Sequence, residues 1–278
     1  MEKWNSWPAL EIQQAAADTL DLIQAFLTDF DVAAIDDNVP ELPLVFFHDA
    51  AERDRVAAAL TAAFPNVVVR PEDVPDEDWA ARSQAALRAV TIGTLTVAPP
   101  WDVPVGSGFS RTTIIIQPSM GFGTGHHATT RLCLAALQQI DLQGKSAIDV
   151  GTGSGVLAIA ARRLGASGVL AIDDDADAIA AAEENVRLNQ ESRIAFELAD
   201  LRASKIGQFD SVIANLTGGL LIAVADRLTS FAVAGGRLVL SGFMDQDEGD
   251  VIAAFAGCSV EHRAQEDEWV CTTLHRSR

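Results

Sequence analysis

Three glycines at alternating positions follow an apolar run that contains an acid. The run at 147–150 is Ala-Ile-Asp-Val, and Gly151, Gly153 and Gly155 come after it. A second apolar run then leads directly into Asp173. A strand, a glycine-rich turn, a helix and a second strand that ends in a carboxylate form the nucleoside-binding half of a doubly wound sheet. The spacing therefore predicts a nucleoside cofactor site, with a simple tight turn as the structural alternative.

The spacing of these glycines also distinguishes between cofactors. A dinucleotide loop has the pattern Gly-x-Gly-x-x-Gly, whereas here the glycines alternate and Asp149 precedes them. This arrangement resembles an S-adenosylmethionine loop, which holds no pyrophosphate and needs glycines so that the backbone can approach the ligand. Asp173 is then placed to accept from both ribose hydroxyls, and Asp200, at the next strand end, from the adenine amino group. A nicotinamide-dependent dehydrogenase is the alternative that the glycines and Asp173 partly permit.

The elements that must position these residues alternate between strand and helix from Ile114 onward. Such alternation predicts an α/β fold, a doubly wound and mostly parallel seven-stranded sheet. The strand at 211–215 ends in Asn215, which places this side chain at the carboxyl edge of the sheet, where ligands bind in open α/β sheets. The alternative role for Asn215 is that of a helix N-cap.

The first third of the chain has a different pattern. We predict strands at 9–12, 32–35, 42–47 and 67–69, and helices at 18–30 and 50–64. The order β-α-β-β-α-β predicts a small ferredoxin-like α+β domain. We therefore place this domain at residues 1–71, a connection with one strand at 91–97 in residues 72–110, and the cofactor-binding domain at residues 111–278.

The composition is that of a folded, acidic globular protein. The 278 residues are 49% hydrophobic, and the formal net charge is −19. Residues 1–100 hold 6 Lys and Arg against 17 Asp and Glu. Because an acidic surface repels phosphate backbones, we expect no direct contact with nucleic acid and favour a basic protein partner. Simple solubility, or a salt-adapted host, is the alternative explanation of the acidity.

We expect a cytoplasmic monomer, without a signal peptide or a membrane span. No apolar stretch follows a basic one at the start, and no apolar run approaches the ~20 residues that cross a bilayer. Cys133, Cys258 and Cys271 form no CxxC pair, which argues against a disulfide framework or a structural zinc site. His126 and His127 have no carboxylate cluster near them, so we also expect no metal site.

A segment upstream of the glycine loop resembles a known family. Residues 120–130 are Met-Gly-Phe-Gly-Thr-Gly-His-His-Ala-Thr-Thr, and either threonine is a candidate cap for the helix that follows. With the glycine loop, Asp173 and the sequence Ala-Asn-Leu at 214–216, this segment resembles the PrmA family. These enzymes are lysine methyltransferases that act on protein eleven of the large ribosomal subunit. The likeness includes Gly-Val-Leu-Ala-Ile-Ala-Ala at 155–161 and extends weakly to Asp-Glu-Asp-Trp at 76–79.

The resemblance implies S-adenosylmethionine as the cofactor and a ribosomal protein as the substrate. By it, Thr130, Gly151, Asp173 and Asn215 contact the cofactor, and the small first domain recognises the substrate. The chain departs from the family at 126 (His for Thr), at 128 (Ala for Pro) and at 216–218. These departures leave open another target, such as a lysine of electron-transfer flavoprotein or a small amine. A non-catalytic binding protein with an inherited fold is a further alternative.

Methyl transfer from a sulfonium requires an amine with a free lone pair. Deprotonating a lysine at pH 7.4 costs roughly 4 kcal/mol, whereas an α-amine costs far less. Asn215 is the first candidate for catalysis. His127 is the best-placed candidate for a base, although hydrogen bonding to its own loop is the more favoured role. The chain contains no tyrosine, which excludes an Asn-Pro-Pro-Tyr clamp for the amine.

Overall fold

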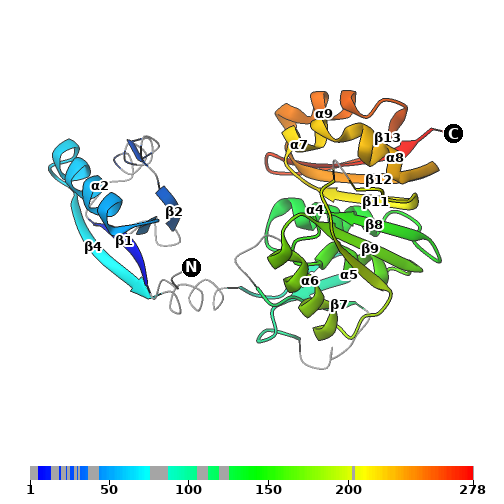
Figure 1. The fold of residues 1–278 in the computed structure, drawn as a ribbon, viewed down its shortest axis with the longest axis horizontal. Helices are drawn as coiled ribbons and strands as arrows, with labels where there is room; N and C mark the ends of the chain where they lie inside the picture. Colours follow the sequence, from blue (N-terminus) through cyan, green and yellow to red (C-terminus); the bar gives the residue numbers. More distant parts are fainter. Residues whose placement is uncertain are drawn as a thin grey trace. The chain divides into compact units, whose positions relative to one another are not determined.

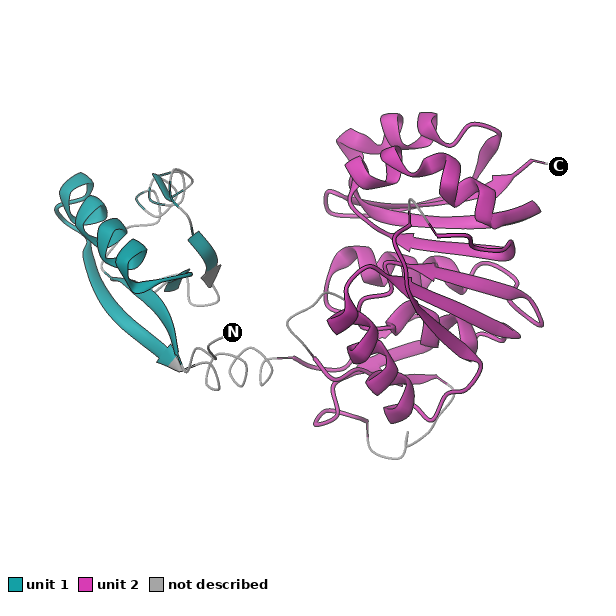
Figure 2. Cartoon of the chain, viewed as in Figure 1, with its two compact units in different colours: residues 1–86 teal, residues 87–278 magenta. Residues whose placement is uncertain are grey.

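The computed structural model describes most of the chain, in two compact units. The described residues are 6–13, 19, 23, 26–27, 30, 32–36, 44–75, 87–104, 112–118, 125–201 and 204–277. The first unit spans Met1–Ala86 and the second Leu87–Arg278 (Figure 2). The division falls inside residues 72–110, where we expected the connection. Each unit has buried apolar clusters of its own.

The first unit contains an antiparallel sheet with the strand order of a ferredoxin-like domain. Its strands are β1 (Ser6–Gln13), β2 (Val32–Asp36), β3 (Leu44–Phe47) and β4 (Val68–Pro75). They lie in the order β2-β3-β1-β4, and every neighbouring pair is antiparallel. This order confirms the predicted ferredoxin-like α+β unit. Strand β4 runs past residue 71, where we placed the end of the domain, because Val74 is still buried and paired with β1.

Helix α2 (Ala50–Ala63) covers this sheet. It begins at the N-cap Asp49, whose carboxylate accepts from the backbone N–H of Glu52 at 2.8 Å. Val56 and Leu60 are buried at helical spacing and join the core formed by the strands. Most residues of the helix predicted at 18–30 lie outside the described residues, and those described as helical are Thr19, Ile23, Phe26 and Leu27.

The second unit is built on a seven-stranded sheet (Figure 1). Its strands are β8 (Ser146–Val150), β9 (Gly168–Asp173), β10 (Ile194–Leu198), β11 (Phe209–Asn215), β12 (Ala232–Met244), β13 (Cys258–Glu266) and β14 (Trp269–Arg276). The order is β10-β9-β8-β11-β12-β14-β13. Strand β14 is antiparallel to β12 and β13, and the other neighbouring pairs are parallel. The predicted doubly wound, mostly parallel sheet is therefore confirmed.

Helices cover both faces of this sheet, because successive side chains along its strands point into two different cores. Ala147 belongs to one buried cluster and its neighbour Ile148 to the other. The first face carries α4 (Ala128–Leu137), α5 (Val156–Arg163) and α6 (Ala176–Leu188), and the second carries α7 (Gly218–Ala223), α8 (Ala225–Phe231), the 3-10 turn Asp245–Asp247 and α9 (Glu248–Ala254). The strand order reverses at β8, so a crevice is expected at the carboxyl ends of β8 and β11.

A small sheet precedes this unit's main sheet and corrects one prediction. We predicted a single strand at 91–97, but β5 (Val90–Ile92) and β6 (Leu95–Ala98) form an antiparallel hairpin, and β7 (Thr113–Ile115) pairs with β6. The hairpin turns at Gly93, whose φ of +58° suits glycine. These strands belong to the second unit, although the first two lie in the range that we assigned to the connection. Among the described residues, no helix is long and apolar enough to span a membrane.

Candidate functional site

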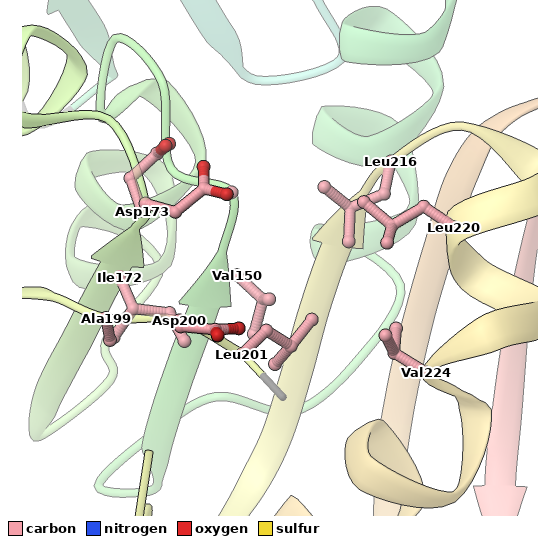
Figure 3. A pocket seen from close by; sticks show the side chains of 11 residues that line it. Val150, Ile172, Asp173, Ala199, Asp200, Leu201, Leu216, Leu220 and Val224 are labelled. Atoms are coloured by element: carbon pink, nitrogen blue, oxygen red, sulfur yellow. The ribbon is translucent and has the colours of Figure 1, made fainter. Parts of the chain in front are cut away.

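A pocket lies at the carboxyl ends of the central parallel strands, at the reversal of strand order. Asp173 and Asp200 lie on one side of it, and Leu216 and Leu220 lie on the other (Figure 3). The complete lining is Val150, Gly151, Ile172, Asp173, Asp174, Ala199, Asp200, Leu201, Leu216, Leu220 and Val224. The apolar members come from β8, β9 and the segments after β10 and β11. They give the pocket an apolar wall beside its three carboxylates.

The glycine loop turns sharply between β8 and α5. Gly151, Gly153 and Gly155 have φ values of +70°, +51° and +80°, a region that other residues seldom adopt. A Cβ atom at Gly151 would also lie 2.5 Å from Cδ2 of Leu216, across the pocket. Gly151 thus lets the side chain of Leu216 lie close to the glycine loop.

A buried carboxylate anchors the loop from beneath. Asp149 is 1% exposed, and its Oδ2 accepts from Oγ1 of Thr152 at 2.8 Å and from the backbone N–H of Ala158 at 3.1 Å. Its Oδ1 is buried and accepts no hydrogen bond from the described residues. Burial raises the pKa of Asp149 to about 7, against the opposing effect of these two donors. Asp149 therefore ties the first turn of α5 to the loop.

Asp173 ends β9 with its carboxylate held in place by the backbone. Its Oδ2 accepts from the N–H of Gly153 at 2.9 Å, and its Oδ1 accepts from the N–H of Asp175 at 3.1 Å. Each oxygen keeps a second lone pair for a further donor. Asp200, which follows β10, lines the same pocket. The two carboxylates that we predicted for the ribose and the adenine therefore lie in one pocket.

The start of α4 lies against the end of β11. His127 is the N-cap of α4, and its Nδ1 accepts from the backbone N–H of Thr129 at 3.3 Å. The cap was predicted at Thr129 or Thr130, but the helix already includes both residues. Oγ1 of Thr129 lies 2.8 Å from Nδ1 of His127 and accepts from Nδ2 of Asn215 at 3.3 Å. The structure thus brings His127 and Asn215 together through a threonine that the sequence did not single out as a site residue.

Other predicted residues lie near the pocket without lining it. Thr130 is 1% exposed in the first turn of α4. Gly153 donates to Asp173, and Gly155 caps α5. Asn215 directly precedes Leu216, which is part of the pocket wall. Residues 119–124, which include the first five residues of the segment that carried the family resemblance, lie outside the described residues, as do residues 76–79.

The lining suits an adenosine-type cofactor. The fixed carboxylate of Asp173 offers lone pairs to two hydroxyls, and the apolar wall offers a surface for a flat base. Three carboxylates beside the pocket disfavour a phosphate-rich cofactor, because like charges repel.

Comparison with known proteins gives the family. A model of the family described as "Ribosomal protein L11 methyltransferase (PrmA)" matches residues 23–277. The chain belongs to the PrmA family. A ribosomal protein L11 methyltransferase of Agrobacterium fabrum is 36% identical over 277 residues, which cover 94% of each chain. One of Myxococcus xanthus is 38% identical over 237 residues, 82% of this chain and 78% of the relative.

A solved structure has the same fold. The ribosomal protein L11 methylase of Lactobacillus delbrueckii subsp. bulgaricus is 29% identical, with a TM-score of 0.63, over 69% of this chain and all of that one. The resemblance to the PrmA family is thereby confirmed, and with it S-adenosylmethionine as the cofactor of this methyltransferase.

Two contacts that hold the start of α4 in place in this PrmA-family protein were not predicted from the sequence. The ring of Trp269 meets the ring of His127 edge-on, with centroids 4.8 Å apart and planes at 68°. Arg131 in α4 forms an ion pair with Glu266 of β13, with Nε 2.9 Å from Oε1, and donates to the carbonyl of His126. Arg131 is a cation in the first turn of α4, whereas cations are favoured near the C-terminus of a helix. This unfavourable position is the sequence signal that pointed to a carboxylate partner.

Proposed function

We propose that this methyltransferase transfers methyl groups from S-adenosylmethionine to lysine side-chain amines of ribosomal protein L11, with the N-terminal amine as a second class of acceptor. The observation that carries the proposal is the position of Asn215, next to the wall of the cofactor pocket. Its amide nitrogen donates to Thr129, and its Oδ1 accepts no hydrogen bond from the described residues. That oxygen is an acceptor for the N–H of an incoming amine.

The cofactor supplies an activated methyl carbon, and the protein supplies position and electrostatics. The acceptor amine must reach the site neutral, which costs a lysine roughly 4 kcal/mol at pH 7.4. Asn215 then orients the neutral amine by accepting one of its N–H groups, which leaves the lone pair free for in-line attack. Because Nδ1 of His127 accepts at the start of α4, we assign His127 to positioning and expect the proton to leave to water.

The proposed cofactor contacts divide by chemistry. Asp173 accepts from the ribose hydroxyls and Asp200 from the adenine amino group, supported by their shared pocket. The loop glycines let the backbone approach the cofactor. We add Asn215 because it precedes the wall residue Leu216, and Thr130 because its neighbour Thr129 accepts from Asn215. The full proposed set is Thr130, Gly151, Gly153, Gly155, Asp173, Asp200 and Asn215.

The first unit is the proposed recognition module for the protein substrate. Ribosomal proteins are commonly basic, and the acidity of residues 1–100 suits such a partner. We propose a recognition domain, a connection and a methyltransferase domain. The bounds predicted for them, 1–71, 72–110 and 111–278, shift because β4 ends at Pro75 and β5 begins at Val90. We also propose that the protein works in the cytoplasm as a monomer, without a membrane or direct nucleic-acid partner. Light scattering of the purified protein tests the monomer.

The test of the proposed function is transfer of label to a defined protein. The purified enzyme is incubated with methyl-labelled S-adenosylmethionine and large ribosomal subunits of its host, and the labelled residues are mapped by mass spectrometry. Label on lysine amines of ribosomal protein L11 is the expected result. Absence of label from every large-subunit protein would reject the substrate, while binding of the cofactor would still be measurable.

A second candidate function keeps the chemistry and changes the target. His126, Ala128 and the sequence Leu-Thr-Gly at 216–218 depart from the family pattern beside the acceptor position. Leu216 also forms part of the pocket wall. Label in a single lysate protein of another mass, with none in ribosomal protein L11, would favour a different lysine, such as one of electron-transfer flavoprotein. Label only in the low-mass fraction would favour a small amine.

A further inference from the structure

Three side chains from different parts of the second unit form one line of hydrogen bonds beside the pocket. Asn215 ends β11, Thr129 lies in the first turn of α4, and His127 caps that helix. Oγ1 of Thr129 lies between the other two, 3.3 Å from Nδ2 of Asn215 and 2.8 Å from Nδ1 of His127. Thr129 is 3% exposed, so its hydroxyl is shielded from exchange with bulk water.

The helix cap fixes the direction of this line. The backbone N–H of Thr129 points at Nδ1 of His127 and can only donate, so Nδ1 must be an acceptor and carry no proton. The hydroxyl of Thr129, 2.8 Å from the same nitrogen, then donates its single proton to Nδ1 and shares the one lone pair of this nitrogen with the backbone N–H. Its oxygen can only accept from Asn215, which therefore presents its NH₂ group. The carbonyl oxygen of the Asn215 amide is left on the other side.

We propose that Thr129 is a positioning residue for methyl transfer, which fixes the amide of Asn215 with Oδ1 toward the acceptor amine. The inference rests on the proposed function, transfer to an amine. If the Asn215 amide flipped, it would present its NH₂ group to the acceptor amine. The N–H donors of the amide would then face the N–H donors of the amine. With Thr129 in place, a flip would leave its oxygen facing the Asn215 carbonyl, which is unfavourable because both groups would be acceptors.

The line is braced at its far end by the hairpin of β13 and β14. Trp269 packs against the ring of His127, and Glu266 holds Arg131, whose guanidinium also donates to the carbonyl of His126. These contacts limit rotation of the His127 ring and of the first turn of α4. The orientation of the Asn215 amide thus depends on residues of α4 and of the hairpin of β13 and β14.

The activity test uses one isosteric change and one conservative change. Thr129→Val removes the hydroxyl and keeps the volume, and Thr129→Ser keeps the hydroxyl. We expect Thr129→Val to lower kcat for methylation of ribosomal protein L11 about tenfold, the effect of one buried hydrogen bond. The Kd for S-adenosylmethionine should stay unchanged, and Thr129→Ser should restore most of kcat.

The matched control is Thr272→Val in β14. Thr272 is 1% exposed, and its Oγ1 has no hydrogen-bond partner among the described residues. We expect this variant to keep the wild-type kcat. A Thr129→Val enzyme with wild-type kcat, or a Thr129→Ser enzyme as slow as Thr129→Val, would overturn the proposal.

A double-mutant cycle separates positioning from structural damage. If Thr129 acts through Asn215, Thr129→Val should have no further effect on single-turnover transfer in an Asn215→Ala background. Equal fold-losses in both backgrounds would contradict the proposal.

Nuclear magnetic resonance gives a readout that needs no activity. The ¹⁵N shift of Nδ1 of His127 should be that of an unprotonated ring nitrogen, and that of Nε2 should be that of an N–H. A protonated Nδ1 in the neutral ring would overturn the inferred direction. If the wild-type protein leaves ribosomal protein L11 unlabelled, the proposed function fails, and this spectrum still decides the direction.

Discussion

We propose Asp173 as the residue on which cofactor recognition most depends. Two backbone N–H groups, of Gly153 and Asp175, hold its carboxylate before any ligand arrives. A preorganised acceptor loses little conformational entropy when it binds a hydroxyl. Hydrogen bonds to a charged acceptor are also stronger than those between neutral groups. Asp173 should therefore contribute more to binding than the exposed Asp200.

Replacement of Asp173 tests this ranking. We expect Asp173→Asn to raise the Kd for S-adenosylmethionine by about 10- to 100-fold, because a charged acceptor of two hydroxyls is lost. Isothermal titration calorimetry measures the change. Asp177→Asn is the control, since Asp177 is exposed in the first turn of α6 and does not line the pocket. Equal affinities for the wild type and Asp173→Asn would remove Asp173 from the site.

Asp149 makes the stability of the second unit depend on pH. Its pKa is raised to about 7 by burial, whereas in the unfolded chain it returns to about 4. The folded state therefore holds a proton between these values that the unfolded state releases. The contribution to stability is full below about pH 4 and is lost as the pH rises through about 7.

Urea unfolding at several pH values should reveal this loss. We expect the free energy of unfolding of the wild type to fall, relative to that of Asp149→Asn, between about pH 4 and pH 7. The asparagine does not titrate, yet its oxygen can still accept from Thr152 and Ala158. The comparison cancels the other carboxylates, which both proteins share. Parallel pH profiles would show that Asp149 does not hold a proton near neutrality.

At the scale of residues, the sequence predicted those that end strands or turn the loop. The glycine loop and Asp173 follow from local spacing, because each lies directly after an apolar run. The contact between Thr129 and Asn215 joins residues that are 86 positions apart, and nothing local to either indicates the other. The His127 cap was also missed, since histidine is an uncommon N-cap and two threonines stand close by.

At the scale of elements, the ends of β11 and β12 shape the pocket wall. Leu216 follows β11, and its side chain reaches across toward Gly151. Gly242 of β12 lies against the backbone of Leu216, at a bulge where the register with β14 shifts. Its φ is +95°, and a Cβ there would lie 2.7 Å from the carbonyl carbon of Leu216. The bulge thus places the segment that carries Asn215.

A pair of glycine substitutions separates backbone strain from this close approach. Gly242→Ala should cost about 3 kcal/mol or more, since it adds a steric overlap to an unfavourable φ. Gly235→Ala has a similar φ of +80° but no atom within 4 Å of the added Cβ, so about 1 kcal/mol is expected. Thermal and urea denaturation measure both. Equal losses of stability in the two variants would mean that the backbone at Leu216 moves to accommodate the added Cβ without an energetic cost.

The sequence predicted the class of each sheet better than the ends of its strands. Alternation of strand and helix is enough for a doubly wound sheet, because parallel strands need helical crossovers. The hairpin of β5 and β6 was merged into one strand, since Gly93 stands inside a run of otherwise β-favouring residues. The antiparallel placement of β14 between β12 and β13 is a long-range property that no local pattern shows.

At the scale of the whole molecule, each unit has the core of an independent domain. The buried cluster of the first unit contains Leu10, Val45 and Leu60, and the clusters of the second begin at Leu95. The pocket that we propose for the cofactor lies within the second unit. Binding of the cofactor and recognition of the protein substrate should therefore be separable.

Removal of the first unit tests that separation. A fragment of residues 87–278 should bind S-adenosylmethionine with the Kd of the full chain and show a single cooperative thermal transition. Its transfer to ribosomal protein L11 should fall by at least about a hundredfold in kcat/KM, because the proposed recognition surface is lost. Wild-type kcat/KM in the fragment would place substrate recognition in the second unit instead.

The most direct test of the account is the chemical identity of the methylated atom. Purified ribosomal protein L11 is incubated with the full-length enzyme and methyl-labelled S-adenosylmethionine, and each labelled residue is identified by tandem mass spectrometry. We predict label on amine nitrogens of lysine, at a rate that Asp173→Asn lowers about 10- to 100-fold at limiting cofactor. Label confined to side chains other than amines would contradict this prediction, and so would an absence of label with both the wild type and Asp173→Asn.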